Sequence, residues 1–450
     1  MESVILTAVA GLLTVLATRN SPGAGPVGPH VKDWRFRGTT RVAAGAIAAL
    51  GIGTACNDGK QAEPDTASAT ADPAEIEELE RLAVLGYVSG SVPATSDSGV
   101  TLHDRERASQ GLNLVLSAHA PGATLIDMDG NVLHEWQASF RQVWPRRKVL
   151  KRFRNANWFR RAHLFPNGDL IGIWAHSAGI LKLDRDSNIL WSSTVPAHHD
   201  LEVMPDGDIY VLTVKNHIVP RVHPRKPLRE DFITVLDPDG RVKRSTSLLE
   251  AFENSKAYRF LWMLHPQKTG IAFHANTISV LDGGLVEQMP EFGRGRVLTS
   301  MRAMDTIAVI DLDGPEVVWA HKGGFVEQHD PQILTDGSLL LFDNKDGFER
   351  SSVEAYDPSN MSLRWAYRGT PEHPFYSEHS GVAQRLANGN TLITESANGR
   401  AFEVTAEGAI VWEYYNPNKA GQDDELRATL HEVQRLPPDF DLSWLTTGAK

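Results

Sequence analysis

The chain has 450 residues, of which 41% are hydrophobic and 22% charged, and these proportions are ordinary for a soluble globular protein. Its formal net charge of -11 argues against nucleic acid as a partner, because nucleic-acid binding needs clustered cations that neutralise phosphates. Cys56 is the only cysteine, which excludes an intramolecular disulfide and a cysteine-based zinc site. The sequence predicts no metal site and no cofactor.

The N-terminal region differs in composition from the rest of the chain, being rich in Ala, Gly, Ser and Thr. Two apolar stretches, at residues 4–17 and 42–56, are shorter than the roughly 18 to 20 residues of a membrane-spanning helix and suit the apolar part of an export signal. The second ends in Gly53-Thr54-Ala55-Cys56, which resembles a bacterial lipoprotein signal. We therefore expect an export signal region over residues 1–56 and a periplasmic or cell-envelope protein. Lipidation of Cys56 would be its only membrane attachment, and an ordinary signal with a chance cysteine is the alternative.

A low-complexity tether is predicted next, over residues 57–115. Its first part, residues 57–74, is rich in Asp, Ser, Thr and Ala, as expected of a flexible connection. Apolar residues at helical spacing predict one short helix over residues 74–88. The remaining residues, 116–450, are predicted to form the main folded domain.

A unit of strand, acidic turn and second strand recurs six times in that domain. The first half reads, for example, LIDMDGNVLHEW at residues 125–136 and AVIDLDGPEVVW at residues 308–319. A period of roughly 45 to 75 residues, alternating apolar positions and Asp-Gly or Asn-Gly turns are typical of β-propeller blades. Because one small sheet cannot bury both of its faces, the blades close into a ring. The sequence thus predicts an all-β, six-bladed β-propeller.

Two other recurrent features are interpreted as scaffold. Tryptophans end most of the first halves and are expected to pack between blades, because they recur in one register and bury a large apolar area: Trp136, Trp191, Trp319, Trp365 and Trp412. The Asp-x-Asp-Gly turns lack the ligand run and closing glutamate of a calcium loop, so we interpret them as hairpin turns.

Most second halves open on a histidine, but these histidines do not share one register. The glycine of the following turn lies eight residues after His199 and His329, and His431 has the same spacing to Asp439. His274 is offset by one residue, and His163 and His379 by more. Residues at the starts of inner strands gather at one mouth of a propeller's channel. We expect His199, His274 and His329 there as functional groups, and a structural role for His163, His379 and His431.

Further polar motifs accompany these three histidines, in the chain order His199-Asp200, His274-Ala275-Asn276, Ser300-Met301-Arg302, Gln328-His329 and Asp343-Asn344. In this order they resemble the motifs of bacterial arylsulfate sulfotransferases. Those enzymes are exported six-bladed propellers that move a sulfuryl group between phenols without a nucleotide sulfate donor. The resemblance covers about residues 120–415.

The resemblance implies a role for each of these residues. His329 would be the nucleophile and form a sulfohistidine in a ping-pong cycle, since a neutral imidazole is a good nucleophile. Arg302 would bind two sulfuryl oxygens with its planar guanidinium, and His199 and His274 would complete the catalytic set. Asn276 and Asn344 would bind substrate. The donor would be a phenolic sulfate ester and the acceptor a phenol.

Other readings of the sequence stay open at this point. One is a non-catalytic propeller that binds a ligand or a protein. Another is a quinone-dependent oxidoreductase, although that class needs more blades, a calcium site of carboxylates and often adjacent cysteines. The basic segment at residues 145–161 is interpreted as a solvated loop, with a lid or a patch that attracts anions as alternatives.

Overall fold

The computed structural model describes residues 73–74, 89–147, 157–421 and 423–446. The predicted export region over residues 1–56 lies outside the described residues, and so does the predicted helix over residues 74–88 except for Ala74. The chain divides into two compact units, Met1–Thr66 and Ala67–Lys450, and all described residues belong to the second. No helix in the described part is long and apolar enough to cross a membrane.

The described residues form an all-β fold with six antiparallel sheets of four or five strands, called here sheets I to VI. Sheet I contains β28 (Leu430–Leu436), β3 (Leu112–Ser117), β4 (Gly122–Ile126) and β5 (Val132–Gln137); sheet II contains β6 (Phe159–Leu164), β7 (Leu170–Trp174), β8 (Gly179–Leu183) and β9 (Ile189–Ser193); sheet III contains β10 (Ala197–Val203), β11 (Ile209–Ile218), β12 (Pro227–Leu236) and β13 (Val242–Ser247).

The second half of the chain supplies the other three sheets. Sheet IV contains β14 (Ala275–Val280), β15 (Val297–Met301), β16 (Thr306–Asp311) and β17 (Glu316–Lys322); sheet V contains β18 (His329–Ile333), β19 (Leu339–Gly347), β20 (Arg350–Asp357) and β21 (Ser362–Tyr367); sheet VI contains β22 (Val382–Arg385), β23 (Thr391–Glu395), β24 (Arg400–Val404), β25 (Ile410–Tyr415) and β2 (Gly99–His103).

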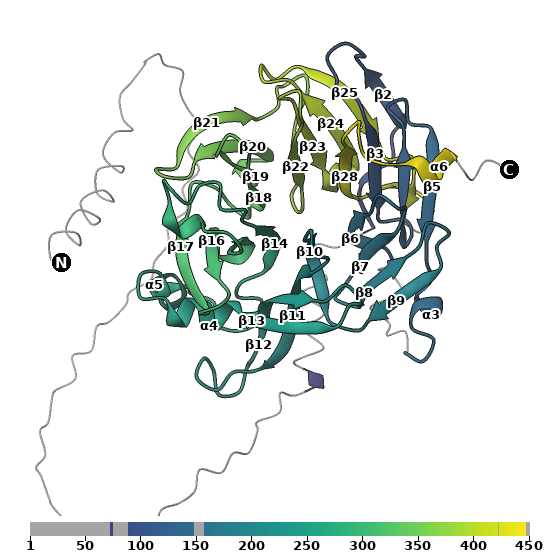
Figure 1. Ribbon diagram of the computed structural model, residues 1–450. Helices are drawn as coiled ribbons and strands as arrows, with labels where there is room; N and C mark the ends of the chain where they lie inside the picture. The colour runs from purple at the N-terminus through teal and green to yellow at the C-terminus, as the bar shows by residue number, and fades with distance from the viewer. Residues whose placement is uncertain (1–72, 75–88, 148–156, 422, 447–450) are drawn as a thin grey trace, which may run out of the picture. The chain divides into compact units, whose positions relative to one another are not determined.

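The sheets follow one another around a central axis, in the manner of a β-propeller (Figure 1). Their innermost strands contact one another in a closed circuit: β6 with β10, β10 with β14, β14 with β18, β18 with β22, β22 with β28, and β28 with β6. One cluster of buried apolar side chains fills each of the six interfaces between neighbouring sheets. The core is therefore divided among the interfaces, as expected when no single sheet can bury both faces.

The two ends of the described chain close this circuit. β28, near the C-terminus, pairs with β3, and β2 is added to the edge of sheet VI through β25. The expected tether over residues 57–115 therefore contains strand residues from Gly90 onward, and the six sheets begin with β2, earlier than residue 116. The sequence pattern missed β2 because an edge strand exposed on one side carries little apolar alternation.

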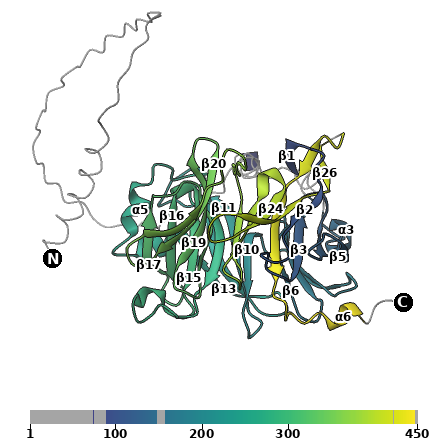
Figure 2. The ribbon, with the colours of Figure 1, turned by 90° about the horizontal axis from the view of Figure 1, so that it is seen from above.

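A further small sheet contains β1 (Gly90–Pro93), β27 (Leu426–Ala428) and β26 (Lys419–Ala420). Figure 2 shows the ring from the side, with β1 and β26 at its upper face and α6 at its lower face. The described residues also form short helices and 3-10 turns that the sequence did not predict: α3 (Phe140–Val143), α4 (Leu248–Asn254), α5 (Arg259–Leu264), α6 (Ser443–Thr446), η2 (Pro290–Phe292), η3 (Arg302–Met304) and η4 (Ser396–Asn398).

Four of the five recurrent tryptophans join neighbouring sheets through a hydrogen bond as well as through packing. The indole of Trp136 in sheet I donates to the carbonyl of Gly168 in a turn of sheet II, at 2.9 Å. The same donation to a carbonyl of the next sheet recurs for the others: Trp191 to Pro238, Trp365 to Ala406 and Trp412 to Met128. Trp319 instead packs edge-on against Phe292 at 5.1 Å. The predicted role of these tryptophans between blades is confirmed.

The acidic turns are hairpin turns, as expected. In the turn after β4, Oδ1 of Asp127 accepts hydrogen bonds from the backbone N–H groups of Asp129 and Asn131. The same pattern recurs at Asp184 and Asp237. A side-chain oxygen that caps its own turn explains the preference for aspartate there.

Candidate active site

The predicted functional histidines sit on irregular backbone at the beginnings of inner strands. The strand register shifts between Ala197 and Leu201 in sheet III, and again at the starts of β14 and β18. His199 and His274 have positive φ angles of 57° and 54°. Bulges of this kind re-aim side chains, and positive φ is uncommon outside glycine. These backbone deviations coincide with the residues that the sequence motifs single out.

His329, at the start of β18, is held in one tautomer by its neighbours. Its Nδ1 lies 2.7 Å from Oδ1 of Asn344 and 3.0 Å from the carbonyl oxygen of Glu327. Asn344 in turn donates from Nδ2 to the carbonyls of Ser377 and Ser380, at 2.9 and 2.7 Å. Both oxygens near Nδ1 only accept hydrogen bonds, so Nδ1 carries the proton and donates. The lone pair of His329 is consequently on Nε2.

The surroundings also keep the His329 ring neutral. Burial, together with the positive charges of Arg302 and Arg160, holds the pKa of His329 well below its usual range, although the hydrogen bond to Asn344 acts in the opposite direction. A neutral imidazole has a nucleophilic nitrogen at physiological pH. His329 therefore has both the tautomer and the charge state of a nucleophile.

His199 and His274 lie next to each other, with ring centroids 5.2 Å apart and nearly edge-to-face. Burial, followed by the charges of Arg229 and Arg302, lowers the pKa of His199 to about 3. Burial and the neighbouring His199 hold the pKa of His274 well below its usual range. Both rings are thus neutral at physiological pH and belong to the same electrostatic environment as His329.

Arg302 lies at the beginning of η3, directly after β15. Its backbone N–H donates to the carbonyl of His274 at 3.1 Å, which joins two of the predicted motifs. Its Nη2 forms an ion pair with Oε2 of Glu327, whose other oxygen lies 2.8 Å from Nζ of Lys345. Two cations therefore share one carboxylate beside His329, which leaves a positive balance favourable to an anion.

Asn276 and Asn344, both predicted to bind substrate, make hydrogen bonds within the protein. Asn276 donates from Nδ2 to the carbonyl of Gln328 at 2.9 Å, and its Oδ1 accepts from the hydroxyl of Thr277 at 3.0 Å. It thereby ties β14 to the residue that precedes His329. Asn344 orients His329, as described above. The geometry thus gives both asparagines positioning contacts around the nucleophile.

The three histidines expected to be structural occupy different environments. His163 packs edge-on against Phe165 at 4.7 Å, in sheet II. His431 is buried and stacks on Trp158, with centroids 5.7 Å apart. The charges of Arg160 and His379 contribute to the lowered pKa of His431, after burial. His379 and His431 thus lie in the same electrostatic environment as the candidate site, although a purely structural role was expected for both.

The basic segment at residues 145–161 ends in two arginines that are not part of a solvated loop. Residues 148–156 lie outside the described part, but Arg160 and Arg161 belong to β6, an innermost strand. Arg160 is buried, and the side chain of Arg161 is only 18% exposed. The interpretation as a solvated loop is wrong for these two residues, because they belong to an inner strand and their side chains are largely buried.

Arg161 contacts three carboxylates from three other sheets. Its Nε lies 2.7 Å from Asp200, its Nη1 2.9 Å from Glu432, and its Nη2 3.5 Å from Asp330. These acids directly follow His199, His431 and His329 in the sequence. The repeated His-acid pair was a visible signal for this cluster, but nothing in the sequence showed that the partner would be Arg161.

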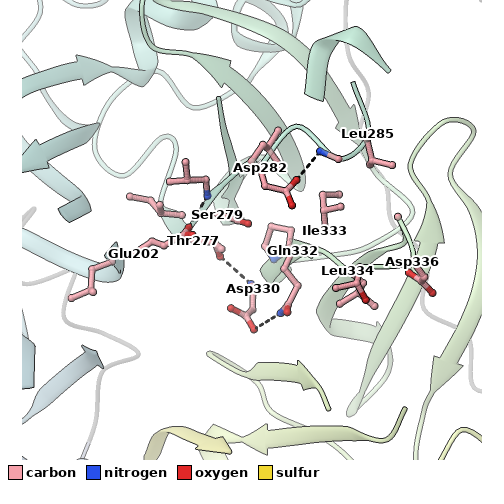
Figure 3. A pocket seen from close by; sticks show the side chains of 18 of the residues that line it. Glu202, Thr277, Ser279, Asp282, Leu285, Asp330, Gln332, Ile333, Leu334 and Asp336 are labelled. Atoms are coloured by element: carbon pink, nitrogen blue, oxygen red, sulfur yellow. Dashed lines mark hydrogen bonds between the residues drawn. The ribbon is translucent and has the colours of Figure 1, made fainter. Parts of the chain in front are cut away.

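A pocket of about 630 Å³ adjoins this cluster (Figure 3). It is lined by the later residues of β14 and β18, and Arg161 and Asp330 are among its lining residues. Asp330 is fixed there by the hydroxyl of Thr277, to which its backbone N–H donates, and by the side chain of Gln332. None of the predicted site residues is among the residues that line this pocket, whereas Arg161 and Asp330 of the cluster are.

Comparison with known proteins connects this site to a family. The family model described as arylsulfotransferase (ASST) matches residues 161–417. No curated protein matches the chain. Similar solved structures include a protein of unknown function from Bacteroides caccae (15% identity, 72% of this chain and 98% of the other, TM-score 0.46). Virginiamycin B lyase from Staphylococcus aureus (13%, 73% and 88%, TM-score 0.40) and a streptogramin B lyase (12%, 77% and 95%, TM-score 0.42) are also similar.

The family match spans more than half of the chain. It runs from Arg161 to a point beyond β25, and so includes all five motifs that carry the predicted site residues. The chain belongs to the arylsulfotransferase (ASST) family.

Proposed function

We propose that this protein transfers a sulfuryl group from a phenolic sulfate ester to a phenol, through a sulfohistidine on His329. The observation that carries the proposal is the state of His329: a neutral ring, fixed by Asn344 with its lone pair on Nε2, beside the cation Arg302. In the first half-reaction, Nε2 attacks sulfur and the bond from sulfur to the donor phenol breaks. In the second, the acceptor oxygen attacks sulfur and the N–S bond breaks. No nucleotide takes part.

The cations beside His329 support this chemistry. The three sulfuryl oxygens keep their negative charge while sulfur moves between nucleophiles, so fixed donors around them lower the barrier. The guanidinium of Arg302 is a planar group that can bind two oxygens. It pairs with Glu327, and the backbone N–H of Arg302 donates to the carbonyl of His274. A phenolic sulfate ester, with one negative charge and an apolar ring, fits these requirements.

The wider predictions belong to the same proposal. Each of sheets I to VI would be one blade of a six-bladed propeller. The protein would be exported to the cell envelope by the region before residue 57, with Cys56 as a lipid attachment point. The apolar stretch at residues 42–56 and the polar segment that follows it support this location.

The direct test is an assay of the purified protein with 4-nitrophenyl or 4-methylumbelliferyl sulfate and an acceptor phenol. We expect release of the chromophore and formation of the acceptor's sulfate ester. Without acceptor, mass spectrometry of the quenched protein should show one added sulfuryl group on the peptide that contains His329. Absence of turnover with a panel of aryl sulfates would contradict the proposal and favour a propeller that only binds a ligand or a protein.

Replacing Asn344 by alanine tests whether this residue positions the nucleophile or binds substrate. We expect kcat to fall about 10- to 100-fold, the range typical of residues that orient a functional histidine, because His329 loses its preferred tautomer. KM for the donor should stay nearly constant, since the Asn344 side chain is already engaged with His329 and two backbone carbonyls. Steady-state kinetics measure both values.

The same change at Asn390, a buried asparagine of sheet VI that contacts Glu403, is the matched control and should leave kcat unaltered. A raised KM with unchanged kcat in Asn344→Ala would show instead that Asn344 binds the donor, as the sequence resemblance implies.

Replacing Arg302 by alanine should lower kcat/KM. We expect the transition state to lose about 2 to 4 kcal/mol of stabilisation, the magnitude found for deletion of one oxyanion donor. Arg302→Lys should recover only part of this loss, because an ammonium group lacks the fork for two oxygens. Lys345→Met serves as the control, since Lys345 shares Glu327 but contributes only a point charge. Equal losses in Arg302→Ala and Lys345→Met would indicate a general effect of charge rather than a specific contact.

A further inference from the structure

A chain of three polar side chains extends from the candidate site into sheet III. His198 and His199 are adjacent residues of β10, and their Nδ1 atoms are 2.6 Å apart. On the other side of His198, its Nε2 lies 3.2 Å from Oδ1 of Asp231, a residue of β12. All three residues are buried. His198 and Asp231 belong to none of the five motifs described above.

The hydrogen bond between the two Nδ1 atoms links the protonation states of the two rings. Only one of these atoms can carry the shared proton, because a hydrogen bond needs one donor and one acceptor. If Nδ1 of His199 donates, its Nε2 carries a lone pair and accepts a proton. If Nδ1 of His198 donates, Nε2 of neutral His199 carries a hydrogen and donates it. If the shared proton moves from His198 to His199 while the Nε2 proton of His199 leaves, His199 therefore changes from a proton donor to a proton acceptor.

Asp231 supplies the charge that allows His198 to hold a proton. A buried carboxylate is costly without a positive partner, and Oδ2 of Asp231 has no hydrogen-bond partner among the described residues. The group beside Asp231 that can carry a positive charge is His198, whose Nε2 lies 3.2 Å from the other oxygen, Oδ1. His199 faces the opposite influence, since Arg229 and Arg302 add to burial in lowering its pKa to about 3. The carboxylate thus lies beside His198, whereas the two cations act on His199.

We propose that Asp231 and His198 form a proton relay that switches His199 between proton donor and proton acceptor in the two half-reactions. This inference rests on the proposed sulfuryl transfer and names the groups that manage its proton. His199 is the residue that exchanges the proton with the phenol oxygen, and Asp231 and His198 act through it as positioning and charge-storing residues.

The protons balance over one cycle. Before transfer, His198 is protonated on both nitrogens and its Nδ1 donates to His199, which presents Nε2–H to the donor ester. As the S–O bond breaks, the Nε2 proton passes to the phenol oxygen, and the Nδ1 proton of His198 passes to Nδ1 of His199. His199 then has a lone pair on Nε2. When the acceptor phenol attacks sulfur, its proton enters there and the relay returns to its first state.

Other charged and titratable groups face the relay. Arg229 and Arg302 act on His199, and His274 lies 5.2 Å from it between ring centroids. His329 and His431 also interact electrostatically with His199. The relay reaches the site through the 2.6 Å contact between Nδ1 of His198 and Nδ1 of His199.

The test compares donors whose phenols differ in basicity, in the variants Asp231→Asn and His198→Gln. In a ping-pong reaction, kcat/KM for the donor reports the first half-reaction alone. Strongly basic leaving groups, such as those of phenyl and 4-methylphenyl sulfate, need a proton, whereas 4-nitrophenolate leaves without one. We expect both variants to lose about 100-fold with the basic leaving groups, the lower end of general acid catalysis, and less than about threefold with 4-nitrophenyl sulfate.

The ratio of the two donor rates is measured on one preparation, so it does not depend on the fraction of folded protein. Glu230→Gln is the matched control, because Glu230 is the neighbour of Asp231 on β12 and pairs with His217 at 2.5 Å instead of with the relay. We expect its donor ratio to equal that of the unmodified protein.

Two results would overturn the relay. If Asp231→Asn and His198→Gln changed all donor rates by one common factor, or changed none, the relay would be wrong while sulfuryl transfer through His329 would stand. If the unmodified protein transferred no sulfuryl group from any donor, the proposed function would fall and the relay with it.

Discussion

Replacing His329 by alanine should abolish sulfuryl transfer, with a loss of about 10⁴-fold or more, since removing a covalent nucleophile leaves only binding and electrostatic effects. The variant should also fail to gain mass when it is incubated with an aryl sulfate. The fold should persist, because the His329 ring makes only two hydrogen bonds, to Asn344 and to the carbonyl of Glu327. Leaving Asn344 Oδ1 buried without its donor should cost about 1 to 3 kcal/mol of stability.

His163→Ala is the matched control for this experiment. His163 begins the second half of the repeat in sheet II, as His329 does in sheet V. Its ring packs on Phe165, and it belongs to none of the five motifs of the predicted site. We expect it to retain activity. Full activity in His329→Ala, or labelling of another residue by the donor, would show that the nucleophile has been assigned wrongly.

Replacing Arg161 by methionine should have the largest effect on stability. Asp200, Asp330 and Glu432 would lose their common cation, and breaking a buried ion pair from one side typically costs about 3 to 5 kcal/mol. The free energy of unfolding, measured by urea denaturation, gives this quantity. A loss below about 1 kcal/mol would show that water or Arg160 already compensates the three carboxylates.

The effect of Arg161→Met should depend on pH. Burial, despite the nearby Arg161, raises the pKa of Glu432 to about 7, and burial likewise raises the pKa of Asp330. An acid whose pKa is raised on folding binds more protons in the folded state between its two pKa values. Such an acid therefore lowers the free energy of unfolding by its full amount at pH values above its folded-state pKa. Below its unfolded-state pKa it has no effect. We expect a larger destabilisation at pH 8 than at pH 5.

Glu432→Gln separates charge from packing in this cluster. The amide oxygen still accepts a hydrogen bond from Arg161, while one of three negative charges is removed. In the double variant with Arg161→Met, Glu432→Gln should restore part of the lost free energy of unfolding at pH 8 and little of it at pH 5. Equal destabilisation at both pH values, with no rescue by Glu432→Gln, would attribute the effect of Arg161→Met to lost packing.

The Arg161 cluster also links stability to the geometry of the site. Asp200 and Asp330 directly follow His199 and His329, and all four residues lie on bulged inner strands. A cation that holds both carboxylates therefore fixes the backbone from which both histidines project. We expect this constraint to be the reason that uncommon backbone angles persist at these positions.

The sequence by itself determined the repeating features of this protein. Alternating apolar residues, the capping aspartates of the turns and the tryptophans depend on contacts within one sheet or with the next, so their pattern is legible in each repeat. The site residues His199, His274, Arg302, His329 and Asn344 were found because their motifs resemble those of a known family, and the structure places these motifs on neighbouring sheets III to V.

Only the tertiary structure decided which side chains meet across the ring. Arg161 and Asp330 are separated by 169 residues in sequence, and the relay joins His198 to Asp231 two strands away within one sheet. Such contacts arise from ring closure and from bulges that redirect individual side chains, and neither leaves a periodic pattern in the sequence. For the same reason the sequence pattern does not distinguish the arginines of β6 from the end of a basic loop. The structure shows that Arg161 contacts acids from three other sheets.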